Sequence, residues 1–396
     1  MRHAFRSVSA GLALAAVLLA PGGPAAADSP NIELRGLLDV GFATRGAGLE
    51  SNWFNAGATS FDAYRFRFFI EGAATKRIYV YTQLILDEIL THPVYGAYVL
   101  FTPWTERDAH VMVGKMPWII GTYGPRTYSD RKPLIGTPLI YQYHTTLRYD
   151  AIPPTADALL AVAGRGQYGV QYGSATSRFR GMPVIYDFCW DAGLAVTGSQ
   201  SGLEYAVGMI NGAPGWMVPS QDNNNGKSVL GRIGFQPIPM VRAGVSASYG
   251  PYLNSSLDPQ LPPGKTASDY QQKLLMADLS IETGHVELRG EGYVNRWMTP
   301  TVGDLDVTGY YAESKLGLPA GTWVAARWEQ MMYSDLTGSS GVPQTWNDDF
   351  DRLETGVGMR FARGATIKAV YQANWQHHLD ETRVHELWAT QLSVSF

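Results

Sequence analysis

Hydrophobic and polar residues alternate along most of this 396-residue chain. Between residues 64 and 71, aromatic and aliphatic side chains occupy the even positions, whereas Arg65, Arg67 and Glu71 occupy odd ones. Successive side chains of a β-strand point to opposite faces. A period of two therefore predicts strands with one apolar face and one polar face.

The same alternation recurs in segments of about ten residues and predicts sixteen strands. The predicted strands are residues 31–43, 60–74, 76–87, 94–104, 109–118, 182–197, 201–211, 227–237, 239–250, 270–283, 285–296, 307–318, 321–334, 350–363, 365–378 and 385–396. No apolar run long enough for a membrane-spanning helix follows residue 27. We therefore expect an all-β fold, a transmembrane antiparallel β-barrel of sixteen strands.

The connections between these strands differ in length. Seven are tight: near 75, 105–108, 198–200, 238, 284, 319–320 and 364. The others are mostly longer and polar: 44–59, 88–93, 119–181, 212–226, 251–269, 297–306, 335–349 and 379–384. Short and long connections alternate, as expected for an antiparallel barrel with short periplasmic turns and long outer loops. Both chain ends would then lie on the short-turn side.

The first 27 residues have the features of a secretory signal peptide. Arg2 and Arg6 precede a short apolar stretch at 11–20, and three alanines at 25–27 suit cleavage. We therefore expect a signal peptide at 1–27 and a barrel at 28–396. A retained N-terminal anchor is the alternative.

The last predicted strand carries a separate signal. Trp388, Thr390, Leu392, Val394 and the terminal Phe396 occupy every second position. This resembles the terminal strand by which bacterial outer-membrane proteins are recognised for assembly. The resemblance implies an assembly signal at Phe396, Val394 and Leu392, with outer-membrane lipid and the barrel-assembly machinery as partners. An ordinary edge strand ending in phenylalanine is the alternative.

Composition supports an exported barrel and argues against nucleic-acid binding. Without Arg2 and Arg6, 29 basic residues face 35 acidic ones, a net charge of −6. Nucleic-acid binding requires a basic footprint. The single cysteine, Cys189, cannot form an internal disulfide, and we expect it to pack between Phe188 and Trp190. A closed barrel would supply the stability that disulfides give other exported proteins.

Several tryptophans fall near predicted strand ends. They would suit the aromatic girdles at the two membrane interfaces. These residues are Trp104, Trp118, Trp297, Trp323 and Trp375.

The connection 119–181 is much longer than the others and has the opposite charge. It contains seven basic residues and three aspartates, a net charge of +4. A loop of this length is usually functional. We expect it to fold inward as a constriction and to raise the local anion concentration, since a low-dielectric wall focuses the field. A solvated, outward-facing loop is the alternative.

The stretch 113–118, with Gly121, resembles the Gly-(Arg/Lys)-x-x-x-Pro-(Phe/Trp)-Gly region of the phosphate-selective porin O and P family. The continuation from Pro133 to Pro138 is also similar. The spacing differs, since two residues separate Lys115 from Trp118 and Gly121 comes late. Membership would imply a trimeric, sixteen-stranded channel with its third loop in the pore. Phosphate selectivity is not implied, because the chain lacks a dense lysine ladder.

Strand parity and the basic loop together predict the residues that line the pore and its constriction. They are Arg126, Arg131, Lys132, Arg148, Arg65, Arg67, Lys115, Arg289, Glu287 and Glu291. For each of these residues the alternative is a wall charge paired with a cross-strand neighbour.

Motifs for catalysis and metal binding are incomplete. Residues 225–228 resemble the end of a P-loop, but Gln221 stands where the first glycine is required. The pair His385-Glu386 lacks the second histidine of a zinc protease, because that position is Ala389. We therefore predict no enzyme, cofactor or metal.

The sequence favours a porin of the bacterial outer membrane that lets small hydrophilic solutes or ions diffuse, with a preference for anions. The alternatives are a structural or adhesive barrel with a plugged lumen, an outer-membrane enzyme, and a soluble exported β-sandwich.

Overall fold

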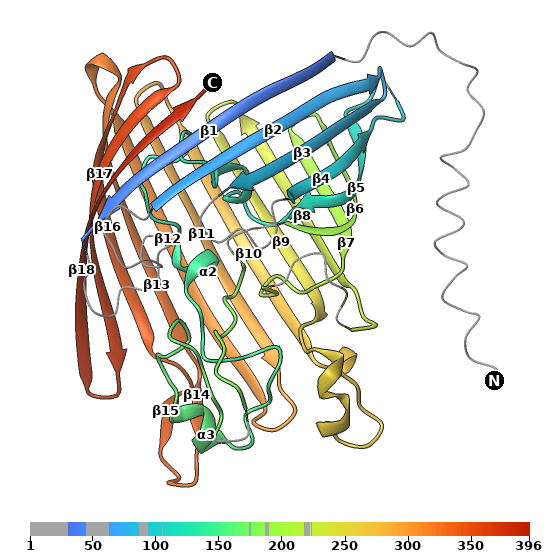
Figure 1. Cartoon of the computed structure of the whole chain (residues 1–396), viewed down its shortest axis with the longest axis vertical. Helices are drawn as coiled ribbons and strands as arrows, with labels where there is room; N and C mark the ends of the chain where they lie inside the picture. Colours follow the sequence, from blue (N-terminus) through green and yellow to red (C-terminus); the bar gives the residue numbers. More distant parts are fainter. Residues whose placement is uncertain are drawn as a thin grey trace, which may run out of the picture.

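Sixteen strands form one closed antiparallel barrel in the computed structural model (Figure 1). The structure describes residues 31–44, 63–86, 94–104, 106–173, 176–186, 190–217, 222 and 224–396. The barrel strands are β1 (Asn31–Ala43), β2 (Ala63–Thr75), β3 (Ile78–Leu86), β4 (Val94–Phe101), β5 (Ala109–Pro117), β6 (Trp190–Gln200), β7 (Leu203–Ile210), β8 (Ser228–Ile238), β9 (Val241–Pro251), β10 (Gln271–Glu282), β11 (Val286–Met298), β12 (Asp304–Gly317), β13 (Thr322–Tyr333), β16 (Asp349–Ala362), β17 (Ala365–His378) and β18 (Glu381–Ser395). The predicted signal peptide and Cys189 lie outside the described residues.

The predicted all-β, sixteen-stranded barrel is confirmed, and the strand limits differ most at the starts of β6 and β18. Strand β6 begins at Trp190 rather than near 182, because Met182 and its neighbours are buried inside the lumen. Strand β18 begins at Glu381, since β17 and β18 stay paired as far as His378 and Glu381. The connection between β17 and β18 is therefore a tight turn, and the strict alternation of short and long connections fails there.

The two ends of the barrel have different connections. Strand β1 closes the barrel against β18, with Leu37 opposite Ser395, and the C-terminus lies at the end with the short turns (Figure 1). We call this the turn end. The opposite end, the loop end, carries the short elements β14 (Asp335–Thr337), β15 (Pro343–Thr345), α3 (Ala156–Leu160), η3 (Ser255–Gln260) and η4 (Ala267–Asp269). The turn end also holds η5 (Pro319–Gly321), between β12 and β13.

The outer face of the barrel is apolar. Val245, Leu275 and Val294 lie on neighbouring strands, and each is about half exposed. A closed barrel pairs the backbone groups of every strand, so an apolar outer face is stable in lipid. This arrangement is that of a transmembrane barrel. Among the described residues, no helix has the length and apolar character needed to span a bilayer.

The predicted aromatic girdle is only partly correct. Trp375 packs against Trp328, which is exposed on the outer face, with ring centroids 5.9 Å apart. Trp118 and Trp297 instead point into the lumen and are buried. Trp297 lies on the same face as Tyr293, because alternate residues of a strand share a face. The sequence pattern assigned these tryptophans by their closeness to strand ends and ignored their parity.

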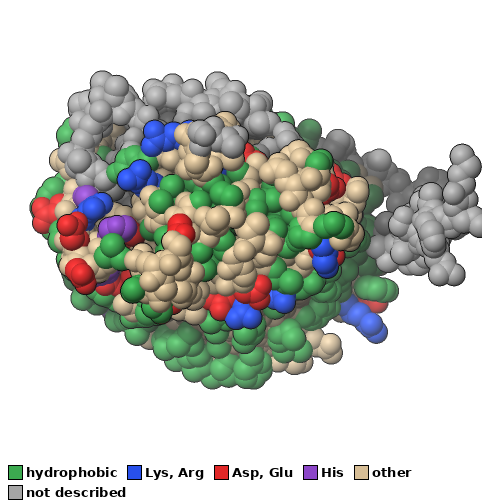
Figure 2. All heavy atoms as spheres, turned by 90° about the horizontal axis from the view of Figure 1, so that it is seen from below, with side chains coloured by type: hydrophobic (Ala, Val, Ile, Leu, Met, Phe, Trp, Pro, Cys, Tyr) green, Lys and Arg blue, Asp and Glu red, His purple; other side chains and the backbone are tan. Residues whose placement is uncertain are grey.

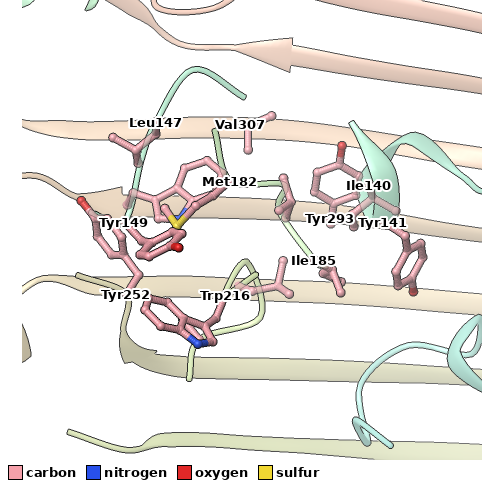
Figure 3. Close-up of a cluster of buried hydrophobic side chains, with 14 of the residues drawn as sticks. Ile140, Tyr141, Leu147, Tyr149, Met182, Ile185, Trp216, Tyr252, Tyr293 and Val307 are labelled. Carbon is pink, nitrogen blue, oxygen red and sulfur yellow. The ribbon is translucent and has the colours of Figure 1, made fainter. Parts of the chain in front are cut away.

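A hydrophobic core fills part of the lumen (Figure 3). Ile140 of the short helix α2 (Leu139–Gln142), together with Leu147 and Met182, comes from the chain between β5 and β6. Tyr293 and Val307 come from the inner face of the barrel wall. We call residues 118–186 the inner loop. Its apolar side chains pack against the wall as in the core of a soluble domain.

Candidate functional site

The inner loop is held in the lumen by carboxylates of the barrel wall. Glu291 on β11 accepts hydrogen bonds from the backbone N–H of Thr122 at 2.5 Å and from the hydroxyl of Tyr141 at 2.6 Å. A bond from a neutral donor to a buried carboxylate is strong because the acceptor is charged. Glu291, predicted as a pore-lining residue, therefore points inward and fastens the loop.

Two further wall carboxylates bind loop backbone. Glu354 accepts from the N–H of Gly136 at 2.7 Å, and Glu329 accepts from the N–H of Leu139 at 2.5 Å. A Cβ atom on Gly136 would stand 2.3 Å from Glu354 Oε2, so a side chain there would force Glu354 to shift. The loop thus contacts β13 and β16 through its main chain.

These carboxylates share a buried arginine on β13. Arg327 donates to Glu313 at 3.1 Å, to Glu329 at 2.8 Å and to Glu354 at 2.7 Å. Arg126, from the 3₁₀ helix η2 (Gly124–Arg126), adds a bond of 2.5 Å to Glu313. Arg352 on β16 lies 3.8 Å from Glu329. We use the name anchor cluster for Arg126, Glu313, Arg327, Glu329, Arg352 and Glu354. Three positive and three negative charges balance in it.

A small polar cavity remains between the inner loop and β1, β2, β4 and β18. Its charged lining residues are Asp39, Arg65, Arg67 and Lys132, and its uncharged ones are Tyr95, Thr127, Ser129, Thr137 and Gln391. We call this the constriction cavity. It has room for about one or two waters. Figure 2, a view of the loop end, shows side chains packed across the mouth of the barrel.

The lining of the constriction cavity has a net formal charge of +2, from three basic residues and one acidic residue. Arg67 Nη1 donates to Asp39 Oδ2 at 3.1 Å, and Ser393 donates to Asp39 Oδ1 at 2.8 Å. Among the described residues, neither the buried Nε of Arg67 nor Oε1 of Gln391 has a hydrogen-bond partner. A buried polar group of this kind requires water or a solute as its partner.

Lys132 enters the constriction cavity from the loop, and its amine is buried. Its Nζ donates to the carbonyl oxygen of Ile135 at 2.6 Å. Burial, together with the positive charge of Lys368, lowers the pKa of Lys132 to about 7. The charge on this amine therefore changes close to neutral pH.

The other basic residues of the loop lie elsewhere. Arg131 is exposed, with its guanidinium 5.3 Å from the ring centre of Tyr128. Arg148 was predicted to line the constriction, but it is buried inside the loop and pairs with Asp150 at 2.8 Å. Arg148 therefore stabilises the loop itself, whereas Arg126 pairs with the wall in the anchor cluster.

Lys115 does not have the predicted lumen position. It shares a face of β5 with Val113, which is 46% exposed on the outside of the barrel. Its Nζ donates to the carbonyl oxygen of Val94 at 2.9 Å. The inward face of β5 carries Met112 and Met116, which pack in the apolar core of the inner loop. The sequence pattern assumed that the charged residue faces the lumen, whereas here the apolar ones do.

The predicted pair Glu287 and Arg289 lies on the inner face of β11 near the turn end. Arg289 pairs with Glu282 and, at 3.2 Å, with Glu287, and Lys315 pairs with Glu287 at 2.7 Å. These residues are separate from the constriction cavity and have partners in neighbouring strands. They form ion pairs along the barrel wall at the turn end of the lumen.

The predicted assembly residues lie along the outside of β18. Leu392 is exposed there, and the ring of the terminal Phe396 stacks on Phe66 with centroids 6.2 Å apart. The backbone N–H of Phe396 donates to Gly36 O at 3.0 Å, which extends the closure of the barrel. Val394 shares this outward face.

The structure brings together Arg65, Arg67 and Lys132 from the predicted site and adds members that the sequence did not single out. Ser129 and Gln391 are uncharged polar residues that no charge pattern marks. Their position depends on the path of the inner loop. Within the described part of the chain, no group of three or more histidine, cysteine or acidic side chains is placed to hold a metal ion.

Comparison with known proteins supports the fold. No protein-family model and no curated protein matches the chain. A loop-deletion mutant of OmpT, an outer membrane protein of Vibrio cholerae, has 10% identity and a TM-score of 0.55 over 93% of this chain and 100% of its own. Salmonella typhi OmpF, in complex with daunomycin, has 11% identity and a TM-score of 0.55 over 92% and 97%.

The outer membrane channel DcaP of Acinetobacter baumannii has 6% identity and a TM-score of 0.54, covering 93% of this chain and 97% of its own. At such low sequence identities, the TM-scores show that the fold is shared. Together with the closed sheet and its apolar outer face, these similarities identify the chain as a sixteen-stranded transmembrane barrel with the fold of outer-membrane porins.

Proposed function

We propose that this barrel is a passive diffusion channel for small hydrophilic solutes or ions, with a preference for anions. The observation that carries the proposal is the constriction cavity, whose described charged lining residues are Arg65, Arg67, Lys132 and Asp39. A positive lining in a low-dielectric passage raises the local concentration of anions. No cofactor and no catalytic step is part of this function.

The size of the constriction cavity limits the solutes. The cavity has room for about one or two waters, which suits a small ion that keeps few of its own waters. The unpartnered Nε–H of Arg67 and the hydroxyl of Thr137 would replace part of the lost hydration shell. Larger solutes would require the inner loop to move.

Similar proteins support the proposal at the level of fold. The neighbours include a channel, DcaP, and an OmpT structure described as a trimer form. We propose a homotrimer on this basis, and membership of the phosphate-selective porin O and P family from the motif at 113–118. We also propose that the strand ending in Phe396 is the signal for assembly in the membrane.

A structural barrel with a plugged lumen is the second candidate. The packed core of the inner loop and the balanced anchor cluster favour it, since both fill the lumen. The two functions differ in conductance. A channel gives discrete current steps in a planar bilayer, whereas a plugged barrel gives none.

The experiment uses the folded barrel in a planar bilayer, after a gel shift between unboiled and boiled samples has verified folding. We expect stepwise conductance and a reversal potential on the anion side in a potassium chloride gradient. The double variant Arg65→Gln and Arg67→Gln should lower the chloride-to-potassium permeability ratio by about 3- to 10-fold.

Arg296→Gln is the matched control, because Arg296 pairs with Asp306 at the exposed rim. Absence of current steps from folded protein would refute the channel. An equal change in the control would refute the role of the constriction cavity.

A further inference from the structure

Lys368 on β17 lies under the turn of the inner loop that carries Lys132. We propose that Lys368 is a positioning residue: it seats residues 129–135 on the wall and sets how strongly the constriction cavity prefers anions as the pH changes. The proposal rests on the proposed channel function and adds a regulation to it.

Lys368 holds the turn at residues 129–135 through three backbone carbonyls. Lys368 Nζ donates to Ser129 O at 2.7 Å, to Lys132 O at 3.3 Å and to Leu134 O at 3.4 Å. All three oxygens therefore point at one buried amine. The side chains of Ser129 and Lys132 leave this turn toward the constriction cavity. The seat of Lys132 depends on Lys368, since the hydrogen bond of the Lys132 amine stays within the loop, at Ile135 O. Elsewhere in the turn, Ser129 donates to Asp39 and Pro133 O accepts from Trp323 of the wall.

The two amines are also electrostatic neighbours. Lys368 Nζ contacts the carbonyl of Leu134, and Lys132 Nζ contacts the carbonyl of the next residue, Ile135. Like charges at such short range disfavour double protonation. The pair differs in this respect from the anchor cluster, where each arginine meets a carboxylate.

Other charged groups face Lys132 from every side of the lumen. Glu354 on β16 favours its protonation, whereas Arg327 on β13, Arg67 on β2 and Lys368 on β17 oppose it. Burial is the largest effect, and the resulting pKa is about 7. As the pH rises through that value, Lys132 loses its proton and the lining of the cavity loses one positive charge. Anion preference should therefore fall between pH 6 and pH 9.

The experiment measures the reversal potential from pH 6 to pH 9 for four proteins: wild type, Lys368→Met, Lys132→Met and Lys315→Met. In the wild type we expect anion preference to fall with a midpoint near pH 7. In Lys368→Met the midpoint should rise by about one pH unit. Lys132→Met should show no fall in this range.

Lys315→Met is the matched control, since it removes an inward amine whose partner is Glu287, at 2.7 Å, outside the turn. Its midpoint should equal that of the wild type. A Lys368→Met midpoint equal to that of the wild type would overturn the proposal, as would a pH-dependent fall that persists in Lys132→Met. A purely structural role for Lys368 would add current noise without moving the midpoint.

A second measurement does not depend on conductance. Acetic anhydride labelling of the folded barrel, followed by mass spectrometry, reports the fraction of neutral Lys132 at each pH. The labelling midpoint should rise in Lys368→Met and stay unchanged in Lys315→Met. If the wild type formed no channels, the proposed function would fail, but this labelling would still decide the role of Lys368. Lys368→Gln replaces Lys368→Met if the latter does not fold.

Discussion

The anchor cluster and the constriction cavity use the same residue types in the same lumen to different ends. In the anchor cluster, the buried Arg327 pairs with three glutamates, two of which also bind the backbone of the inner loop. In the constriction cavity, three basic residues face one aspartate, and some room for water remains. The first holds the loop, and in the described lining of the second, basic side chains outnumber acidic ones.

The comparison shows that charge type does not identify a selective site in a barrel. Buried charges are tolerated where partners compensate for lost hydration, and such pairs cancel each other's field. Selectivity requires charges that are not balanced, beside a space that a solute can enter. Arg126 and Lys132 lie six positions apart in the loop and fall on opposite sides of this division.

The largest expected effect is in the anchor cluster. Arg327→Met would leave three carboxylates buried without their main partner, and removing one member of a buried ion network costs about 3–5 kcal/mol. We expect a corresponding loss in the free energy of unfolding in urea. Arg296→Gln, at the exposed rim, is the control and should leave the unfolding midpoint nearly unchanged. Equal effects in both variants would remove the distinction between anchored and exposed charges.

The second-largest effect is expected from acid, which should destabilise the inner loop. His144 is buried, its Nδ1–H donates to Gly181 O at 2.5 Å, and burial lowers its pKa to about 4. Because the unfolded loop binds a proton more readily, stability should be lost as the pH falls from about 6.5 toward 4, by about 3 kcal/mol in total. Proteolysis of the loop as a function of pH measures this. In His144→Gln the acid sensitivity should decrease, and an unchanged sensitivity would contradict the assignment.

A smaller effect is expected at Glu291. Tyr141→Phe removes the hydroxyl that donates to this carboxylate at 2.6 Å. Loss of a hydrogen bond to a buried charged group costs about 1.5–3 kcal/mol. The unfolding midpoint should fall while ion selectivity stays unchanged, since Tyr141 lies outside the constriction cavity. A change in ion selectivity with no loss of stability would contradict the assignment of Tyr141 to anchoring of the inner loop.

Lys132→Met should have the opposite signature. It removes one positive charge from the constriction cavity and leaves the anchor cluster intact. At pH 6, where the amine is mostly protonated, we expect the chloride-to-potassium permeability ratio to fall by about 2- to 5-fold. At pH 9, where the wild-type amine is mostly neutral, the two proteins should have equal ratios. A constant difference at both pH values would contradict the assigned titration.

The smallest effect is expected for Lys115→Gln. Lys115 lies on the outer face of β5 and donates to Val94 O, so it contributes no charge to the lumen. Selectivity and conductance should match those of the wild type in the same bilayer measurement. A clear loss of anion preference would restore Lys115 to the pore and refute its observed position.

Strand periodicity predicted the barrel because the side chain of each residue reports which face it lies on. Arg67 and Glu291 were placed inward by that rule, and both lie inward in the structure. The rule fails where the lumen itself is apolar, as at Lys115 and Trp297. There the inner loop provides a hydrophobic core inside the barrel, and apolar side chains point both ways.

The inner loop could be predicted only by length and charge. Its contacts join residues far apart in the chain, such as Gly136 with Glu354 and Ser129 with Lys368. No local pattern encodes such pairs. The loop arginines looked alike in sequence, yet Arg148 folds the loop and Arg126 anchors it. Their roles depend on which carboxylate each one meets.

The sign of the wild-type reversal potential tests the central claim most directly. With folded barrel in a planar bilayer and a potassium chloride gradient at pH 6 and low ionic strength, screening is weak and Lys132 is mostly protonated. Our account predicts discrete channels with a potential on the anion side. A potential on the cation side would contradict selection by the constriction cavity, and folded protein without channels would contradict the diffusion function itself.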